Sequence, residues 1–270
     1  MDQTRTHPVA VQELQRAWRA VQAGQFRNAA SRGPHAGSVR LWRPTGLVLP
    51  VVGCHAHAGS TCLAVAIATA ADNGRVIECC TAPASGLAGA ATAELGTTRT
   101  GWVIGRRGDV ALARAAGVYV SPDEVPVPEE PATDVALTVL DVGWELGQVL
   151  ASSGWLGEYL TTAGQIVATT TATVPGLRRL ETALTRLGAE RTTVAVLGPP
   201  RRQWPAALTA AMGPATRAVE RGGRVLCVPH DKRLGLRGID STPLPAALLR
   251  AAQTIWRHAG AGDHLEKGTL

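Results

Sequence analysis

The sequence predicts an α/β fold with a doubly wound, mainly parallel sheet flanked by helices, preceded by a short N-terminal helical extension. Three observations indicate this fold. Strand-like and helix-like segments alternate from residue 46 onward. The run VALTVLDVG (135–143) is apolar without alternation, as in central parallel strands covered on both faces. A glycine-containing segment (53–59) follows the first apolar run and precedes an alanine-rich helical segment, which places it at a strand-to-helix turn.

The predicted strands are short apolar runs bounded by turn residues, at 47–52, 75–80, 100–105, 117–122, 135–143, 165–171, 192–198 and 224–231. The predicted helices have apolar residues at helical spacing or a high alanine content, at 61–71, 85–95, 111–117, 174–188, 204–212 and 244–259. Right-handed crossovers between parallel strands put a ligand crevice at the carboxyl ends of the strands.

Three parts are expected along the chain: a basic N-terminal helix and linker (1–45), the α/β domain (46–260) and a C-terminal tail (261–270). Within the first part, apolar residues at helical spacing predict an amphipathic helix over 10–23. Seven arginines against Asp2 and Glu13 give residues 1–45 a charge of about +5, close to the net charge of +6 of the whole chain. Such an arm either contacts nucleic acid, acidic lipid or an acidic partner, or is a solvated extension.

The composition argues against several classes of protein. The five cysteines are odd in number and form no CxxC, so we expect reduced thiols in a cytoplasmic protein and no zinc centre. No apolar run reaches the roughly 18 residues that a membrane-spanning helix needs. The N-terminus lacks the apolar core of a signal peptide. We therefore expect neither a transmembrane segment nor secretion.

The segment VVGCHAHAGSTC (51–62) resembles a phosphate-binding loop. In such a loop, glycines let backbone N–H groups surround the phosphates, a lysine neutralises their charge and a hydroxyl binds magnesium. Gly53 and Gly59 keep the frame and Thr61 keeps the hydroxyl, but Ser60 stands at the lysine position. This removes a main stabiliser of phosphoryl transfer. The alternative is a glycine-rich turn of the kind that many doubly wound folds carry.

On these residues the chain from about 46 to 258 resembles the ParA/MinD family of P-loop ATPases, which position plasmids, chromosomes and division machinery. The family loop reads KGGxGK[ST][ST] after a strand and a glycine. The alignment puts His55 at the signature lysine, Ala56 and His57 at the glycine pair, Ala58 and Gly59 next, Ser60 at the second lysine, and Thr61 and Cys62 at the hydroxyl positions.

Three further segments support the resemblance. VALTVLDVG resembles the Walker B strand, with Asp141 as the magnesium-linked carboxylate. VLCVPHDKRL resembles the loop that lies against the base, with Pro229 at the matching proline. RVIECCTAPASGLAG resembles the VLLIDxDPxxxL segment, although Cys80 and Ala82 stand where the two aspartates belong.

The resemblance implies a site for ATP or another nucleoside phosphate with Mg²⁺, although the altered loop also allows a chain without a cofactor. The implied magnesium ligands are Thr61 and Asp141. The implied nucleotide-binding residues are Gly53, Cys54, His55, Ala56, His57, Ala58, Gly59, Ser60, Thr61, Cys62 and Pro229.

By family analogy the chain is an assembly or positioning factor, with a protein partner and a homodimer, in partition, conjugative transfer or secretion. The missing lysines and aspartates imply a weak or inactive ATPase. Two alternatives stay open: a slow but active ATPase, and a DNA-associated scaffold that uses residues 1–45.

Other side chains have both functional and structural interpretations. His55 and His57 are spaced to share a metal or to donate to phosphate, and His55 is a candidate to replace the signature lysine in part. Glu78 is either structural or a displaced carboxylate. Two arginine pairs in loops either reach phosphate or nucleic acid or stay solvated: Arg106 with Arg107, and Arg201 with Arg202.

Overall fold

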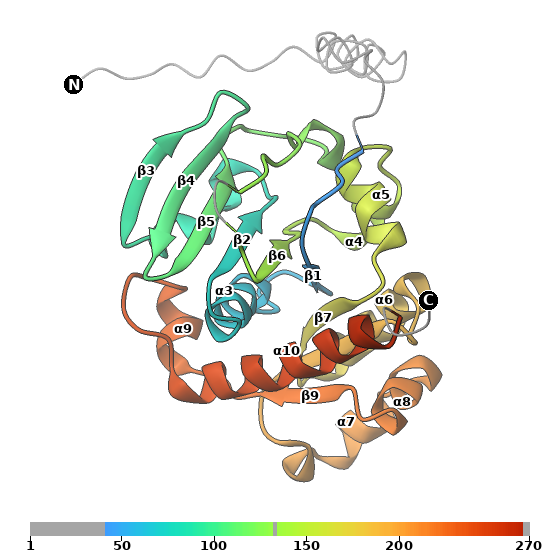
Figure 1. Ribbon diagram of the computed structural model, residues 1–270. Helices are drawn as coiled ribbons and strands as arrows, with labels where there is room; N and C mark the ends of the chain where they lie inside the picture. The colour runs from blue at the N-terminus through green and yellow to red at the C-terminus, as the bar shows by residue number, and fades with distance from the viewer. Residues whose placement is uncertain (1–40, 132–133, 267–270) are drawn as a thin grey trace, which may run out of the picture. The chain divides into compact units, whose positions relative to one another are not determined.

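The computed structural model describes residues 41–131 and 134–266, with side chains described up to residue 259 (Figure 1). These residues belong to one compact unit, Leu41–Leu270. The helix expected at 10–23 lies outside the described residues, as does most of the basic segment 1–45.

The described residues form one nine-stranded sheet in the order β3-β4-β5-β2-β6-β1-β7-β8-β9. The strands from β5 to β9 in that order pair in parallel, and only β4 runs antiparallel to its neighbours. This confirms the doubly wound, mainly parallel sheet. The strands are β1 Val48–Gly53, β2 Gly74–Glu78, β3 Ala93–Thr97, β4 Trp102–Arg107, β5 Val110–Ala115, β6 Leu137–Asp141, β7 Ile166–Thr171, β8 Thr192–Leu197 and β9 Val225–Val228.

Helices cover both faces of the sheet. One face carries α3 (Ser60–Ala70), α9 (Lys232–Arg237) and α10 (Ala246–Glu266), and α10 passes beside α3 (Figure 1). The residues from Leu63 to Ala68 are all buried because α3 is enclosed between the sheet and α10. The other face carries α4 (Leu146–Leu150), α5 (Trp155–Thr162), α6 (Val174–Leu187), α7 (Ala206–Ala210) and α8 (Pro214–Arg221).

Two predicted helices are wrong. The segment 111–117 forms β5, because Gly108 and Asp109 make a tight turn that pairs β4 with β5 and this pairing outweighs the helix propensity of its alanines. The segment 85–95 forms a short 3₁₀ turn, Leu87–Gly89, followed by edge strand β3. The strand expected at 117–122 does not form either, and helices α4, α5, α8 and α9 were not predicted from the sequence.

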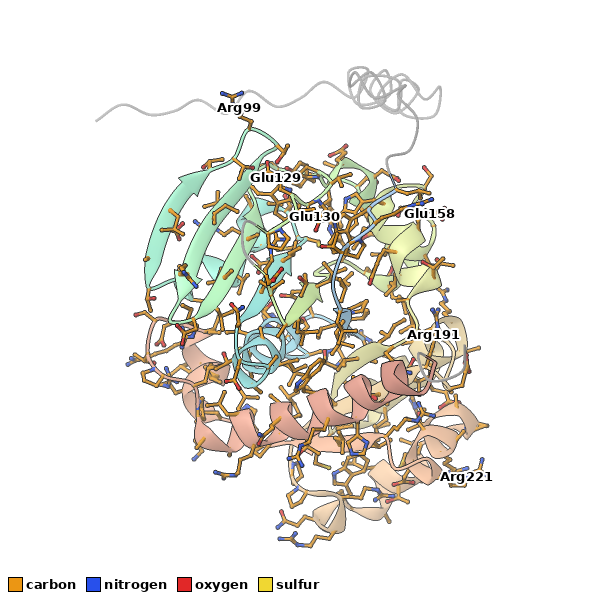
Figure 2. The ribbon with its side chains drawn as sticks, viewed as in Figure 1. Arg99, Glu129, Glu130, Glu158, Arg191 and Arg221 are labelled. Carbon is orange, nitrogen blue, oxygen red and sulfur yellow. The ribbon has the colours of Figure 1, made fainter. Side chains whose placement is uncertain are left out.

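A proline-rich segment, Val125–Pro131, takes the place of a crossover helix between β5 and β6. Three buried side chains donate hydrogen bonds to its alternate carbonyl groups: Trp155 to Val125 (2.8 Å), Trp102 to Val127 (3.3 Å) and Arg75 to Glu129 (2.8 Å). Figure 2 shows Glu129 and Glu130 of this segment. The segment therefore covers the sheet without regular structure of its own.

The compact unit extends at both ends beyond 46–260. Trp42 is buried and its ring contacts those of Trp155 and Tyr159, with centroids 5.2 and 5.1 Å away. At the other end, α10 continues to Glu266. The functional division into 1–45, 46–260 and 261–270 remains a prediction.

Candidate functional site

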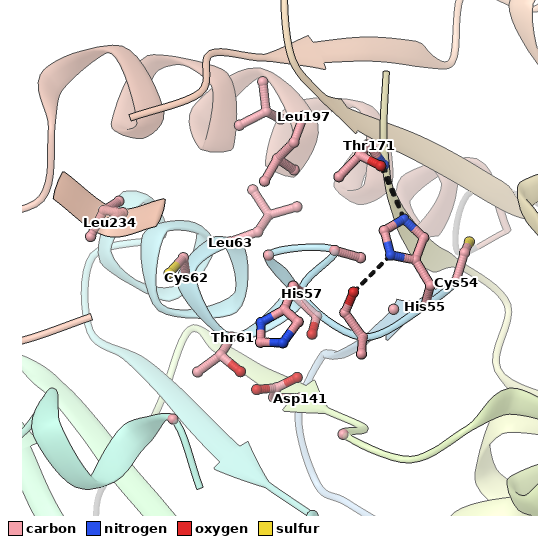
Figure 3. Close-up of a pocket in the computed structure, with 18 of the residues that line it drawn as sticks. Cys54, His55, His57, Thr61, Cys62, Leu63, Asp141, Thr171, Leu197 and Leu234 are labelled. Atoms are coloured by element: carbon pink, nitrogen blue, oxygen red, sulfur yellow. Dashed lines mark hydrogen bonds between the residues drawn. The ribbon is translucent and has the colours of Figure 1, made fainter. Parts of the chain in front are cut away.

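The ends of five parallel strands meet at a cavity of about 1260 Å³ (Figure 3). Parallel strands present their carboxyl ends at one edge of the sheet, where doubly wound folds bind ligands. In the sheet, β2 lies on one side of β1 and β7 lies on the other. The chain first runs from β1 to β2 and later crosses from β6 to β7, in the opposite direction. The cavity lies where the strand order reverses in this way. The last residues of these strands all line it: Gly53, Asp141, Thr171, Leu197 and Val228.

The fold brings all the sequence-predicted site residues to this cavity. The loop from Gly53 to Gly59 joins β1 to α3, as expected for a phosphate-binding loop. Residues 53–62, Asp141 and Pro229 all line the cavity, although they lie far apart in the sequence.

The N-terminus of α3 faces the cavity without a cap from its own chain. Gly59 stands at the N-cap, no side chain accepts a hydrogen bond there, and the first turn has no acidic residue. Leu63 donates to Gly59 O (3.0 Å), but among the described residues no acceptor is assigned to the backbone N–H groups of Ser60, Thr61 and Cys62. Three donors and the positive end of the helix dipole therefore meet here, which is an arrangement that attracts anions.

Gly59 is required by its surroundings as well as by its conformation. Its φ of +81° lies in the left-handed region, and a Cβ here would approach Leu197 Cδ2 to 2.5 Å. Leu197 ends β8 and packs over the loop. The glycine thus allows close contact between the loop and the neighbouring strand.

His55 holds the loop to the adjacent strand (Figure 3). Its Nε2 accepts from the Thr171 backbone N–H (3.3 Å) and lies 3.2 Å from Thr171 Oγ1, while Nδ1 lies 2.8 Å from Ala56 O. Because a backbone N–H can only donate and a carbonyl can only accept, these contacts select the neutral tautomer with hydrogen on Nδ1. In this arrangement both ring nitrogens are engaged within the protein, so His55 supports the loop.

His57 differs from His55 in its environment. It is exposed with φ of +59°, and no hydrogen bond to it is assigned among the described residues. The two imidazoles do not belong to a metal-binding group, since no cluster of three or more His, Cys, Asp or Glu side chains suited to a metal occurs in the described part of the chain.

Asp141 is a buried carboxylate beside the start of α3. It is 1% exposed, and neither carboxylate oxygen has a partner in hydrogen-bonding geometry within the described residues. Burial, together with the charge of Glu78, raises its pKa to about 7, against the lowering effect of the nearby hydroxyls of Thr61 and Ser60. A buried carboxylate with so little compensation favours a proton or a nearby cation.

Glu78, by contrast, has a full set of partners. It pairs in register with Asp141 across β2 and β6 and is 1% exposed. Its carboxylate accepts from Ser85 Oγ (2.5 Å), Gly86 N (2.7 Å) and Leu87 N (3.1 Å). Burial raises its pKa, and these hydrogen bonds oppose the rise. Its position inside an apolar strand was the sequence signal for this buried carboxylate.

Neither loop arginine pair lines the cavity. Arg107 is buried and donates to the carbonyls of Ala90, Asp240 and Thr242, which ties β4 to the segment before α10. Arg201 pairs with Glu220 (2.7 Å) and lies 4.7 Å from the centre of the Trp204 ring. Arg106 and Arg202 are exposed.

The cations that do line the cavity were not predicted. Arg179 and Arg186 are exposed on α6, and neither takes part in an ion pair among the described residues. They lie seven residues apart, on one face of the helix. Only the fold brings this face of α6 to the loop, so the sequence carried no local signal for it.

Part of the cavity lining is apolar. Pro229 follows β9, with the polar residues His230 and Asp231 directly after it, and the apolar lining residues are Leu197, Val228, Leu234, Ile239 and Leu248. The cavity thus combines an anion-attracting helix end with apolar side chains, which suits a ligand with a charged part and a flat apolar part.

No protein family model matches the chain. No curated protein matches it by sequence. Among the described helices, none combines the length and apolar character needed to cross a membrane.

Several solved structures have a similar fold. A plasmid partition protein from Borrelia burgdorferi B31 bound to AMPPNP has a TM-score of 0.48 at 8% identity, covering 78% of this chain and 97% of that one. A chain of the MinC:MinD cell division protein complex of Aquifex aeolicus has a TM-score of 0.46 at 16% identity, covering 78% and 96%. The cell division ATPase MinD of Pyrococcus furiosus has a TM-score of 0.46 at 14% identity, covering 79% and 100%. At these values the roles of individual residues follow only from the geometry of the site.

Proposed function

We propose that the chain binds the phosphates of a nucleotide, together with Mg²⁺, at the N-terminus of α3, and works as a nucleotide-responsive assembly or positioning factor of the ParA/MinD kind. The observation that carries this proposal is the pairing of three uncapped N–H groups with the buried, uncompensated carboxylate of Asp141. The first group favours an anion and the second favours a cation, and a metal-bound phosphate supplies both.

The residues present fit such a ligand. The backbone N–H groups of Ser60, Thr61 and Cys62 would bind phosphate oxygens, and the apolar side chains near Pro229 would accept a base. Thr61 supplies the hydroxyl suited to Mg²⁺. Both oxygens of Asp141 are covered, so this carboxylate acts on the cation through the Ser60 and Thr61 hydroxyls. Bound Mg²⁺ would neutralise part of the phosphate charge.

The same site favours binding over hydrolysis. Ser60 is neutral where the family has a lysine, and both ring nitrogens of His55 are engaged with Thr171 and Ala56. Few positive charges are then placed to stabilise the charge that develops during phosphoryl transfer. We infer a weak or inactive ATPase.

A slow ATPase is the second candidate function, and one observation favours it. Arg179 and Arg186 line the same cavity without ion-pair partners among the described residues. A guanidinium that reached the phosphates would restore part of the missing charge. Replacing both arginines with glutamine would then abolish turnover while leaving the uncapped end of α3 intact.

Titration with ATP and GTP, with and without Mg²⁺, tests the proposal. Binding is expected to need Mg²⁺ and to weaken in Thr61→Ala and Asp141→Ala. Thr69→Ala is the matched control, because this threonine lies at the exposed far end of α3 and bonds only Val65 O. Turnover lost in Thr61→Ala would establish the slow ATPase instead. Absence of binding at millimolar nucleotide would refute both candidates.

A restoring change tests the geometry of the loop. Ser60→Lys adds the cation at the position where phosphate oxygens are expected to converge, and each tenfold gain in affinity corresponds to about 1.4 kcal/mol. We expect tighter nucleotide binding. Unchanged affinity in a folded Ser60→Lys protein would show that the loop does not present residue 60 to the phosphates.

The proposal includes a protein partner and a nucleotide-dependent homodimer, which sedimentation with and without Mg²⁺ and nucleotide would detect. The alternative of DNA association concerns residues 1–45, most of which lie outside the described residues. Replacing the seven arginines of this segment with glutamine distinguishes DNA association from the nucleotide-dependent function. Salt-sensitive DNA binding lost in that variant would support the scaffold.

A further inference from the structure

The Thr61 side chain is packed between a carboxylate and a glycine. Its hydroxyl is close enough to Asp141 to lower the pKa of that carboxyl. On its other side lies Gly86, where an added Cβ would meet Thr61 Cγ2 at 2.9 Å, Oγ1 at 3.3 Å and Cβ at 3.4 Å. The Thr61 side chain therefore lies close to Gly86, in space that is free only because this residue has no Cβ.

Glu78 determines the position of Gly86. Its two carboxylate oxygens accept from the Gly86 and Leu87 N–H groups and from Ser85 Oγ, at 2.5 to 3.1 Å. This carboxylate is buried and does not line the cavity, so it is not available to a ligand. Charge-assisted hydrogen bonds of this kind are stronger than neutral ones, and three of them fix a short segment firmly.

We propose that Glu78 is a positioning residue, which holds the segment Ser85–Leu87 against Thr61 and so fixes the hydroxyl that faces the ligand site. Glu78 is hydrogen-bonded to Gly86, and Gly86 is a close neighbour of the Thr61 side chain. The role in ligand binding rests on the proposed function, whereas the mechanical link to Thr61 does not. The link connects the segment after β2 to the start of α3 within the interior of the protein.

The mechanical link is tested without any ligand by methyl NMR of threonine-labelled protein, with the Thr61 signal identified by its loss in Thr61→Ser. In Glu78→Gln the side chain keeps its size but loses the charge, and the Thr61 methyl is expected to shift and broaden. Gly86→Ala should move the same signal with Glu78 intact. The matched control is Glu158→Gln, an exposed glutamate of α5. An unmoved Thr61 signal in Glu78→Gln would overturn the proposal.

The role in binding is tested by a double-mutant cycle on Mg²⁺–ATP affinity. Glu78→Gln is expected to weaken binding about fivefold in the wild-type background and less than about twofold in the Thr61→Ala background, because the effect passes through Thr61. A purely electrostatic effect of the lost Glu78 charge, on Asp141 or on the cation, does not pass through Thr61 and should appear equally in both backgrounds. Equal losses in both backgrounds would overturn the coupling.

The outcomes separate the two proposals. Wild-type protein that binds no nucleotide refutes the proposed function, and the Thr61 methyl signal then still decides whether Glu78 positions this side chain. Wild-type protein that binds nucleotide, with additive losses in the cycle, supports the proposed function and overturns the coupling to Glu78.

Discussion

Two helices begin at the same edge of the sheet, after neighbouring strands, and their first turns differ. At the start of α6, Thr173 is extended and its Oγ1 accepts from Gly176 N (3.0 Å), and Pro175 removes another donor. At the start of α3, Gly59 is left-handed and no side chain caps the helix. The topology is equivalent, so the difference comes from the residues alone. A ligand site here is specified as much by the missing cap as by a motif.

The largest expected effect concerns the carboxylate beneath the uncapped helix. Asp141→Asn should stabilise the protein by about 4 kcal/mol above pH 7, because the folded state raises the pKa from 3.8 to about 7. Below about pH 4 the aspartate is protonated in both states and costs nothing. Between pH 4 and 7 only the unfolded state ionises, so the wild type loses stability as pH rises.

Urea unfolding of wild type and Asp141→Asn from pH 4.5 to 8 measures this difference. The two proteins should diverge steadily up to pH 7 and then run parallel. Asp109→Asn, at an exposed turn, is the control and should follow the wild type. Parallel curves over the whole range for Asp141→Asn would show that the carboxylate has found compensation that the structure does not assign to it.

The second prediction concerns the left-handed glycine at the start of α3. Gly59→Ala should destabilise the protein by about 2 kcal/mol, since alanine resists a φ of +81° and its Cβ would displace Leu197. Nucleotide affinity should fall as well, because the loop must move away from β8. Thermal unfolding and nucleotide titration check this. Gly108→Ala, also at positive φ but with open space around it, isolates the backbone contribution.

Much of the fold was predictable because its central strands are short runs rich in apolar and β-branched residues. β6, β7 and β8 are buried on both faces, so their sequences carry the signal directly. The stretch that forms β5 misled prediction because alanines favour a helix locally, while pairing with β4 is a contact between separate segments. Local helix or strand propensity could not reveal this pairing.

The position of the loop was predictable to the same extent. The glycine-containing loop lies in one stretch of sequence between a strand and a helix, and the structure places it at the cavity. That it binds phosphate stays a prediction. The support of the loop was not predictable. Thr171 contacts His55 from 116 residues away, and Leu197 packs on Gly59 from another strand. Such partners are set by the strand order, which no local pattern contains.

The third prediction removes the cap that α6 has and α3 lacks. Thr173→Ala should cost about 1 kcal/mol of stability, since the Gly176 N–H loses its acceptor. Thr173→Ser keeps the hydroxyl and should cost much less. Chemical denaturation of the two variants measures the cap. Equal stability of Thr173→Ala and Thr173→Ser would show that the side-chain cap of α6, which α3 lacks, does not stabilise the protein.

The smallest expected effect comes from giving α3 the closed end that α6 has. Cys62 stands at the third position of α3, where a glutamate can reach back to the N-cap N–H. Burial raises the pKa of Cys62 to about 11, and nearby Asp141 adds to the rise while Arg107 opposes it. Cys62→Glu should therefore change stability by less than about 0.5 kcal/mol, because the favourable helix dipole is opposed by the cost of a charge at a partly buried position. The new carboxylate would occupy the donors that a phosphate needs, so nucleotide and pyrophosphate binding should be lost together.

Cys62→Gln, which has the same size without the charge, should retain more of both. A Cys62→Glu protein that binds pyrophosphate as well as the wild type would show that anions bind elsewhere, and the contrast between the two helix ends would then have no functional meaning.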